Sequence, residues 1–434
     1  MLSNFRKIYY RSPFFVQKLV FMFPKEWLFG KQYRYFLGLL KNGVILTDRR
    51  KETLALVYNL ELPTDLISRE INDYWPQISF IDKNLRFKYR RNYGIRSFTV
   101  ETGGVTGKPA NFIQNNSVWF KELAYIDYLF QHIGLKKDDL KLSFRGGEFG
   151  LVKDGLWYLN PLHREICFSP FSINKNSILI LKRVLNKFKP KIWYGYPSVF
   201  KSLFTFLKSE SVSLDFNPNT LLLISESFTK ADVQFLKFHL PETRITSFYG
   251  LSERCAFGFP LAGDISGYKI DTNYSYVELV DDHGNVITED GVLGEIVATT
   301  YDNDAMPLIR YRTGDYTRWK DYSRKHIGLI EGKWSGKSLI DVDGQKIPFS
   351  AINFHDDSWG DITLVQFRQV SPGLVTVSID GVTFDIKQKL IVTLNKRVGK
   401  SIQFVLNPTN EFIKTKRGKT PLLVTNSSST LVQN

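Results

Sequence analysis

The order of three short motifs constrains this chain more than any other feature of its sequence. Residues 101–109 read ETGGVTGKP, residues 249–253 read YGLSE, and residues 308–315 read LIRYRTGD. Each motif combines glycine with residues that carry hydroxyl or charged groups. Segments of this kind are typical of loops that a rigid scaffold holds around a ligand. The three motifs together indicate one composite binding site.

The first motif predicts a phosphate-binding loop. Its glycines let backbone N–H groups converge on a phosphate oxygen, its hydroxyls add donors, and its lysine adds a mobile positive charge. The residues expected to hold phosphate are Thr102, Gly103, Gly104, Thr106, Gly107 and Lys108. The spacing differs from a Walker A motif and does not imply a P-loop fold. Taken alone, the motif also fits an ordinary structural turn.

The other two motifs supply the remaining groups that ATP and magnesium require. The ring of Tyr249 can lie against a base, and the hydroxyl of Ser252 can donate to a phosphate oxygen. Glu253 offers the hard oxygen ligand that Mg²⁺ prefers. Asp315 ends a predicted turn that would expose its carboxylate to the two hydroxyls of a ribose. The sequence therefore predicts an ATP site with bound Mg²⁺.

The charge of the chain limits its partners only loosely. A net charge of +15 draws anions such as nucleotides, acidic sugars and membrane headgroups. The basic residues are spread along the chain, and the densest group consists of Lys182, Arg183, Lys187, Lys189 and Lys191. This spread favours a solvated basic surface over a nucleic-acid patch. We expect no nucleic-acid partner, and peripheral contact with a membrane stays open.

Cysteine content and hydropathy bear on the compartment. Cys167 and Cys255 are the only cysteines, which argues against a disulfide framework or a cysteine-rich zinc site. The six histidines show no metal-ligand spacing. No run of about 18 apolar residues occurs, and residues 1–30 are expected to be helical and not a signal peptide. We expect a cytoplasmic protein, with association at the inner face of the membrane as an alternative.

Length and periodicity predict an α/β fold in two domains. Short β-rich runs alternate with longer helical ones from residue 65 to about 320. The expected elements are a buried parallel strand at 221–224, a helix at 112–133, a helix capped by Ser198, and a β-hairpin or meander over 277–288. A Gly- and Lys-rich stretch, 328–337, separates this body from a small α+β segment. That segment carries runs at 338–347, 375–379, 384–386 and 402–406 and a helix near 387–398. The predicted domains are 1–332 and 333–434.

With these motifs, the chain resembles the adenylate-forming enzymes of the acyl-CoA synthetase superfamily. Within it, the chain is similar to the phenylacetate–coenzyme A ligase-like group and to its branch found in capsule and other surface-polysaccharide biosynthesis. Residues 190–198 (PKIWYGYPS), 294–300 (GEIVATT) and 305–315 (AMPLIRYRTGD) also carry the resemblance. It implies a large multi-sheet adenylation domain followed by a small, mobile α+β domain.

The resemblance also implies roles for individual residues. Lys108 and Lys419 would stabilise charge during catalysis, and Glu253 would hold Mg²⁺. The nucleotide would contact the phosphate loop together with Ser225, Glu226, Tyr249, Gly250, Ser252, Arg312 and Asp315. The acid would bind near Tyr194, Gly195, Tyr196, Pro197 and Ser198. From the residues alone, Arg310 and Arg312 fit a structural pairing with a carboxylate as well as they fit a phosphate contact.

The chain departs from the family pattern in two places. Gly103 and Val105 stand where the family usually has a serine and a threonine. The hinge candidates, residues 332–333 and 336–337, read Gly-Lys where the family has Gly-Arg. Lysine lacks the planar fork that holds ribose and phosphate bidentately. These changes leave open how strongly the chain binds ATP.

The implied activity is ATP-dependent formation of an acyl-adenylate from a small carboxylate, with release of pyrophosphate. The acyl group would then pass to a thiol or an amine, with coenzyme A, an amino acid or an amino sugar of a glycan as acceptor. The setting that the resemblance implies is surface (capsular or O-antigen) polysaccharide biosynthesis, which favours the glycan-linked acceptor. Two alternatives are an adenylyl transferase acting on a hydroxyl and a degenerate nucleotide-binding scaffold. The departures from the family pattern favour the scaffold, whereas Glu253, Asp315 and Lys419 count against it.

Overall fold

The described residues of the computed structural model lie mainly between 25 and 415. Residues 16, 19, 23, 423–424 and 431–432 are described as well. Outside the described part lie 47, 58–71, 73–74, 92–93, 103–109, 137–138, 146–155, 171–172, 227, 229, 262–264, 333–337, 349–363 and 399. The chain forms two compact units. Unit 1 contains residues 1–100, 112–134 and 247–333, and unit 2 contains 101–111, 135–246 and 334–434. The division of the chain at 332/333 into two domains stays a prediction.

A six-stranded sheet forms the core of unit 2, in the order β4-β5-β3-β6-β7-β8. Its strands are β3 (Lys141–Phe144), β4 (Trp157–Asn160), β5 (Glu165–Phe168), β6 (Ile192–Gly195), β7 (Thr220–Leu223) and β8 (Arg244–Ser247). Strands β5, β3, β6 and β7 run parallel, and β4 is antiparallel to β5. The apolar run at 221–224 is confirmed as the buried strand β7. Such continuous burial is typical of parallel strands covered on both faces.

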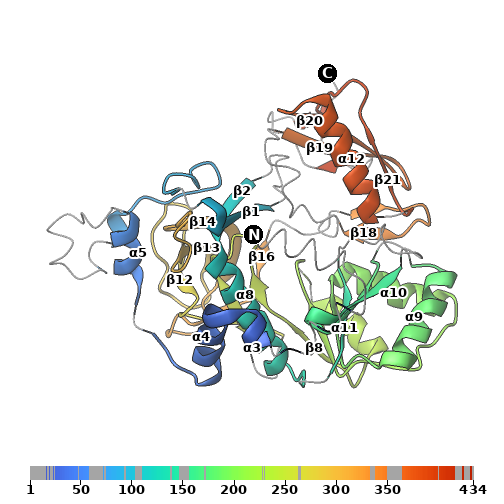
Figure 1. Cartoon of the computed structure of the whole chain (residues 1–434), viewed down its shortest axis with the longest axis horizontal. Coiled ribbons are helices and arrows are strands. Elements are labelled where there is room, and N and C mark those ends of the chain that lie inside the picture. Colours follow the sequence, from blue (N-terminus) through green and yellow to red (C-terminus); the bar gives the residue numbers. More distant parts are fainter. Residues whose placement is uncertain are drawn as a thin grey trace. The chain divides into compact units, whose positions relative to one another are not determined.

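Three helices accompany this sheet in the part of the chain drawn in green (Figure 1): α9 (Lys175–Phe188), α10 (Pro197–Ser209) and α11 (Lys230–His239). A capping box starts α9, where the Asn174 side chain accepts from the Ser177 N–H and the Ser177 hydroxyl accepts from the Asn174 N–H. The prediction that Ser198 caps α10 is wrong. Tyr196 is the N-cap and Pro197 opens the helix, because the fixed φ of proline suits the first helical position.

Two antiparallel sheets form the β-structure of unit 1. The first has the order β12-β13-β14-β16, and the second has the order β15-β11-β10-β9. Their strands are β9 (Tyr249–Gly250), β10 (Phe257–Pro260), β11 (Gly267–Ile270), β12 (Ser275–Val280), β13 (Leu293–Thr300), β14 (Tyr311–Arg318), β15 (His326–Gly328) and β16 (Glu331–Gly332). Of the described part of the Gly- and Lys-rich stretch at 328–337, Gly328 ends β15, and Glu331 and Gly332 form β16. The hairpin or meander predicted over 277–288 agrees with the structure in outline. The chain turns at 281–285, Val286 forms an antiparallel bridge to Val280, and the main ladder of β12 is its antiparallel pairing with β13.

The helices of unit 1 are α3 (Lys25–Leu28), α4 (Gly30–Lys41), α5 (Arg50–Val57) and α8 (Asn116–His132). Unit 1 also contains the short 3-10 turns η1 (Trp75–Gln77) and η2 (Gly94–Arg96). The paired strands β1 (Ser97–Thr102) and β2 (Ala110–Asn115) each lie partly in unit 1 and partly in unit 2. The predicted helix at 112–133 thus begins four residues later, because Phe112 and Gln114 point into the core from a strand. Helix α4 packs on α8, and Asp127 of α8 accepts hydrogen bonds from Lys25 and Tyr33.

The C-terminal part of unit 2 is α+β, as the sequence predicts. A mixed sheet has the order β21-β20-β19-β23, and helix α12 packs against β21. The elements are β17 (Ser338–Ile340), β18 (Lys346–Pro348), β19 (Leu364–Ser371), β20 (Leu374–Asp380), α12 (Phe384–Val398), β21 (Gln403–Leu406), β22 (Lys414–Thr415), β23 (Leu423–Val424) and β24 (Leu431–Val432). The run at 384–386 opens α12 and is not a strand. No helix in the described part of the chain combines the length and apolar character needed to cross a membrane.

A buried ion pair fixes the start of β14. The guanidinium of Arg310 donates to both oxygens of Glu278, at 3.3 and 3.1 Å, and each side chain is 2% exposed. Arg310 Nη1 also donates to the Ile78 carbonyl at 3.0 Å, and the Trp75 indole N–H donates to Glu278 at 2.8 Å. Arg310 thus has the structural pairing that the sequence left open.

Removing one partner of this pair should destabilise unit 1 strongly. We expect Glu278→Ala to lower the free energy of unfolding by about 3–5 kcal/mol, because Arg310 would stay buried without a counter-charge. Urea unfolding followed by circular dichroism measures the loss. The matched control is Glu331→Ala, which removes an exposed pair with Arg318 and should cost about 1 kcal/mol or less. Equal losses in the two variants would contradict this account.

A second buried carboxylate, Asp341, makes stability depend on pH. It lies between β17 and β18, where Oδ1 accepts from the N–H groups of Asp343 and Gln345, at 3.0 and 2.8 Å. Its other oxygen has no hydrogen-bond partner among the described residues. Burial raises the pKa of Asp341 from 3.8 to about 6.

Because folding favours the protonated acid, the stability that Asp341 contributes is complete below about pH 4 and is lost as pH rises through 6. At pH 7.5, Asp341→Asn should therefore raise the free energy of unfolding by about 1–3 kcal/mol. The gain should shrink toward zero at pH 4. Urea titrations at both pH values test this, with the exposed Asp282→Asn as control. A gain that is the same at both pH values would exclude titration of Asp341 as the cause.

Candidate nucleotide-binding site

The second and third motifs meet inside unit 1. The Tyr249 hydroxyl, at the start of β9, donates to Asp315 Oδ2 on β14 across 3.0 Å. Both residues are buried. Burial, and then the charge of Asp315, raise the pKa of Tyr249 well above its ordinary value, so the phenol keeps its proton and stays a donor. Tyr249, predicted to contact the base, and Asp315, predicted to contact the ribose, therefore form one hydrogen-bonded pair.

The expectation that a turn exposes Asp315 is wrong. Asp315 lies within β14 and is only 8% exposed. The register with β13 shifts between Glu295 and Val297, and Gly314 takes a φ of +78°, which a residue with a side chain rarely adopts. The Asp315 N–H then donates to the Thr313 hydroxyl at 3.1 Å. A β-bulge, and not a free turn, therefore aims this carboxylate.

A second carboxylate, Glu253, is held in the same manner. The hydroxyl of Tyr311, on β14, donates to Glu253 Oε1 at 3.3 Å. Lys83 Nζ lies 4.0 Å from the same oxygen. Tyr311 and Asp315 are four residues apart on β14, so this strand of the third motif contacts both ends of the second motif, Tyr249 and Glu253. Sequence reasoning missed Tyr311 and Lys83, although Tyr311 stands between the two arginines of the third motif.

The donor set suits a magnesium ion that is held mainly by phosphate. No group of three or more His, Cys, Asp or Glu side chains gathers into a metal cage among the described residues. Glu253 offers one buried carboxylate, and Mg²⁺ in nucleotide sites is commonly held by one or two carboxylates together with substrate phosphates and water. The residues present therefore fit Mg²⁺ delivered with a nucleotide, and Glu253 would hold it.

Arg312 is oriented by a partner that the sequence did not identify. Its Nε and Nη2 lie 2.7 and 2.6 Å from Glu295 Oε2 on the neighbouring strand β13. The other oxygen of Glu295 accepts the Gly314 N–H at 2.8 Å and so stabilises the bulge before Asp315. Glu295 belongs to the segment 294–300 that carries the family resemblance, which is the one sequence signal that could have found it. A nucleotide contact by Arg312 stays a prediction.

The predicted acid-binding residues lie at the end of β6 and the start of α10, in unit 2. Tyr194 and Gly195 end β6, and Tyr196 and Pro197 lead into α10, with Ser198 in its first turn. The Ile224 N–H donates to the Gly195 carbonyl at 3.0 Å, which brings Ser225 and Glu226 to the adjacent strand end. A side chain at Gly195 would meet the Phe144 carbonyl oxygen at 2.6 Å, so this position requires glycine.

The hydroxyl of Tyr194 is already committed to a buried network. It donates to Glu165 Oε1 at 2.5 Å, and Arg145 donates to both oxygens of Glu165, at 3.2 and 3.3 Å. Burial alone would raise the pKa of Glu165, but the charges of Arg145 and Lys141 hold it well below its ordinary value. A contact between Tyr194 and an acid would therefore involve the ring or backbone and not the hydroxyl.

Several of the predicted site residues lie outside the described part of the chain. Thr102 is the last residue of β1, but Gly103, Gly104, Thr106, Gly107 and Lys108 lie outside the described residues, as does Lys419. Gly250 and Ser252 are described, and the Ser252 carbonyl accepts from Gln114 at 2.9 Å. The first motif and the C-terminal lysine therefore remain predictions from sequence.

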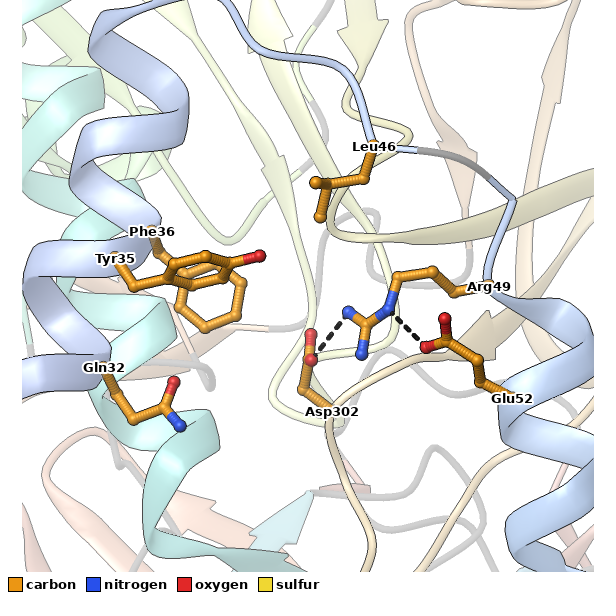
Figure 2. Close-up of a pocket in the computed structure, with 7 residues that line it drawn as sticks. All are labelled: Gln32, Tyr35, Phe36, Leu46, Arg49, Glu52 and Asp302. Atoms are coloured by element: carbon orange, nitrogen blue, oxygen red, sulfur yellow. Dashed lines mark hydrogen bonds and ion pairs between the residues drawn. The ribbon is translucent and has the colours of Figure 1, made fainter.

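Unit 1 also contains a separate cavity of about 390 Å³, lined by Gln32, Tyr35, Phe36, Leu46, Arg49, Glu52 and Asp302. Figure 2 shows Arg49 between the two carboxylates, with Asp302 at 2.8 Å and Glu52 at 3.0 Å. The side chains of Tyr35 and Gln32 lie across the cavity from this group (Figure 2). None of the predicted nucleotide residues lines it, so this cavity is distinct from the candidate nucleotide site.

Comparison with known proteins confirms the resemblance to phenylacetate–coenzyme A ligases. No family model matches the chain. The chain is 24% identical over 222 residues to Protein CapK of Staphylococcus aureus, covering 49% of this chain and 46% of that protein. It is 42% identical over 74 residues to the phenylacetate-coenzyme A ligase of Aromatoleum evansii, which is 16% of each protein. The matches thus span less than half the length of these curated relatives.

Among solved structures, an open conformation of 2-hydroxyisobutyryl-CoA ligase, in complex with 2-HIB-AMP and CoA, aligns over 90% of both chains. The TM-score is 0.47 and the identity 15%.

The Tyr249–Asp315 pair should be measurable as a coupled unit. We expect Tyr249→Phe to lower the free energy of unfolding by about 1–3 kcal/mol, because it leaves a buried carboxylate without its phenol donor. Asp315→Asn weakens the acceptor, so the double variant should lose less than the sum of the single losses. Urea unfolding of the four proteins gives a coupling energy, expected at about 1 kcal/mol or more. Strict additivity would show that the two groups do not interact.

Proposed function

We propose that this chain, a relative of the phenylacetate–coenzyme A ligases, is an AMP-forming ligase that activates a carboxylic acid with ATP. The observation that supports it most directly is the placement of Asp315 and Glu253. Two buried carboxylates, from two motifs of the resemblance, are each fixed by a tyrosine hydroxyl in one unit. Fixed carboxylates of this kind suit a ribose and a phosphate-bound metal, respectively.

In the proposed reaction, an oxygen of the acid attacks the α-phosphorus of ATP and the bond to pyrophosphate breaks. The product is an acyl-adenylate. Asp315 would accept hydrogen bonds from the ribose hydroxyls, and Tyr249, which orients Asp315, would present its ring to the base. Mg²⁺ would supply positive charge to the phosphates, with Glu253 as its protein ligand. Lys108 and Lys419 would add charge where it builds up on the phosphate and the attacking carboxylate.

A second step would transfer the acyl group. A thiol or amine attacks the acyl carbon, the bond to AMP breaks, and AMP leaves with the electron pair. The local identity to phenylacetate-coenzyme A ligases supports coenzyme A as acceptor. An amine on an amino acid or amino sugar is the alternative acceptor, in a setting of surface-polysaccharide synthesis. That setting rests on the resemblance and on the similarity to CapK.

The test is ATP–pyrophosphate exchange by the purified full chain against phenylacetate, other aromatic acids, amino acids and uronic acids. We expect exchange with one acid class. Lys419→Ala should lower the exchange rate at least about 100-fold, since it removes charge stabilisation at the reacting atoms. Asp315→Asn should raise the KM for ATP about tenfold or more, because it weakens a charged hydrogen-bond acceptor. The matched control is Lys416→Ala, three residues before Lys419 in the same basic stretch, which should retain wild-type exchange.

Each other outcome points to a defined alternative. ATP binding without exchange with any acid would favour a nucleotide-binding scaffold over an enzyme. Lack of ATP binding would overturn the proposal. When exchange is observed, mass spectrometry of the acceptor separates the two transfer chemistries, because acyl transfer adds the acid and adenylyl transfer adds AMP. Equal loss in the Lys416 and Lys419 variants would show that general charge, and not one lysine, matters.

A further inference from the structure

The outer face of α4 carries positive charge without any acidic residue. The buried face of the helix, Tyr33, Phe36, Leu37 and Leu40, repeats at helical spacing and packs toward α8. The opposite face exposes Lys31, Arg34 and Lys41. Since α4 contains no Asp or Glu, no carboxylate of its own compensates these charges. A face of this kind suits an anionic partner.

Large hydrophobic side chains are exposed beside these charges. Trp27 is 73% exposed and Ile45 69%, and Phe23 and Tyr35 are each about half exposed. About a third of the large hydrophobic side chains that stand exposed in the described part of the chain lie between residues 19 and 45. That window is less than a tenth of the sequence. This concentration is far above the scattered exposure that a soluble surface shows.

Specific contacts hold the chain on both sides of α4, at Lys25 and at residues 44–46. Asn273 Oδ1 accepts the Leu46 N–H at 2.8 Å, and Asn273 Nδ2 donates to the Val44 carbonyl at 2.6 Å. Ile45, between them, is thereby held outward. Lys25 pairs with Asp127 at 2.6 Å and anchors α3, which carries Trp27.

We propose that Phe23, Trp27, Lys31, Arg34, Tyr35 and Ile45 form a docking surface for an anionic lipid bilayer, here called the N-terminal surface. Lysine and arginine side chains are attracted to anionic headgroups, and tryptophan and tyrosine rings settle at the membrane–water interface. Aliphatic groups such as Ile45 gain from an acyl-chain boundary but do not stack on nucleic-acid bases. The contact is peripheral, and it does not depend on the proposed adenylation activity.

Vesicle sedimentation tests the docking surface. Purified full chain is mixed with vesicles of phosphatidylcholine alone or with 30% phosphatidylglycerol, at low and at 0.5 M salt. We expect sedimentation only with the anionic vesicles and less of it at high salt, because salt screens the attraction. Lys31→Glu/Arg34→Glu and Trp27→Ala/Ile45→Ser should each lower the partition coefficient at least about tenfold. Circular dichroism melting curves confirm that these surface variants stay folded.

The matched controls lie elsewhere on the chain. Arg183→Glu/Lys187→Glu reverses the same charges on the exposed face of α9, within the densest basic group of the sequence. Phe238→Ala removes an aromatic side chain that is 75% exposed on α11. Both controls should sediment like the wild type. Equal loss in the α9 control would overturn the proposal in favour of net charge, and so would failure of the wild type to sediment.

Two further outcomes would assign the N-terminal surface to a different partner. A doubled molar mass without lipid that Trp27→Ala/Ile45→Ser abolishes, with sedimentation unchanged, would make it a contact between copies of this chain. Binding of a short DNA duplex that these variants weaken, with sedimentation unchanged, would make it a nucleic-acid surface. ATP–pyrophosphate exchange in lipid-free buffer should be the same in wild type and variants, so failure of the docking surface and failure of the proposed function are distinguishable.

Discussion

The placement of the third motif depends on the buried guanidinium of Arg310. This group reaches Glu278 on β12 and the carbonyls of Trp75, Pro76 and Ile78, so one side chain joins the sheet to the segment that precedes β1. The backbone of Arg310 continues the same connection, because its carbonyl accepts the Ile81 N–H and the Ile81 carbonyl accepts the Arg312 N–H. Tyr311, which follows directly, is thereby fixed between two anchored residues, and its hydroxyl meets Glu253. The buried Arg310–Glu278 ion pair thus anchors the residue next to Tyr311, whose hydroxyl contacts the candidate metal ligand Glu253.

The parts of the fold that the sequence predicts correctly are those where local pattern and final environment agree. The apolar run at 221–224 is one example. A parallel strand that is buried on both faces is apolar at every position, so its sequence lacks the usual polar–apolar alternation. The predictions at Ser198 and 112–115 failed because the local sequence there is compatible with more than one secondary structure. Serine is a common helix cap, so Ser198 fits that role by residue type alone. Residues 112–115 fit the start of a helix equally well, but in the structure they form a strand, and one face of that strand buries Phe112 and Gln114.

At the candidate site, too, the local sequence does not determine the contacts that side chains make. The residue types of its motifs indicated a carboxylate for a ribose and another for a metal, but not their partners. Tyr249 and Asp315 lie 66 positions apart, and no local pattern reports such a contact. The sequence Thr-Gly-Asp at 313–315 reads as a turn, whereas pairing with two neighbouring strands makes it a bulge that buries the acid. Long-range strand pairing, and not propensity, decided both the exposure and the partners of these groups.

The two cysteines have a consequence for how this molecule can be studied. Cys167 and Cys255 are both buried and free, and burial raises the pKa of each thiol well above its ordinary value. Thiolates, the species that alkylating reagents attack, are therefore scarce at neutral pH. The native chain should therefore react little with thiol reagents, so single cysteines introduced at its surface can be labelled selectively. A pair of spin labels or fluorophores, one in each unit, would then report an inter-unit distance at each stage of a turnover.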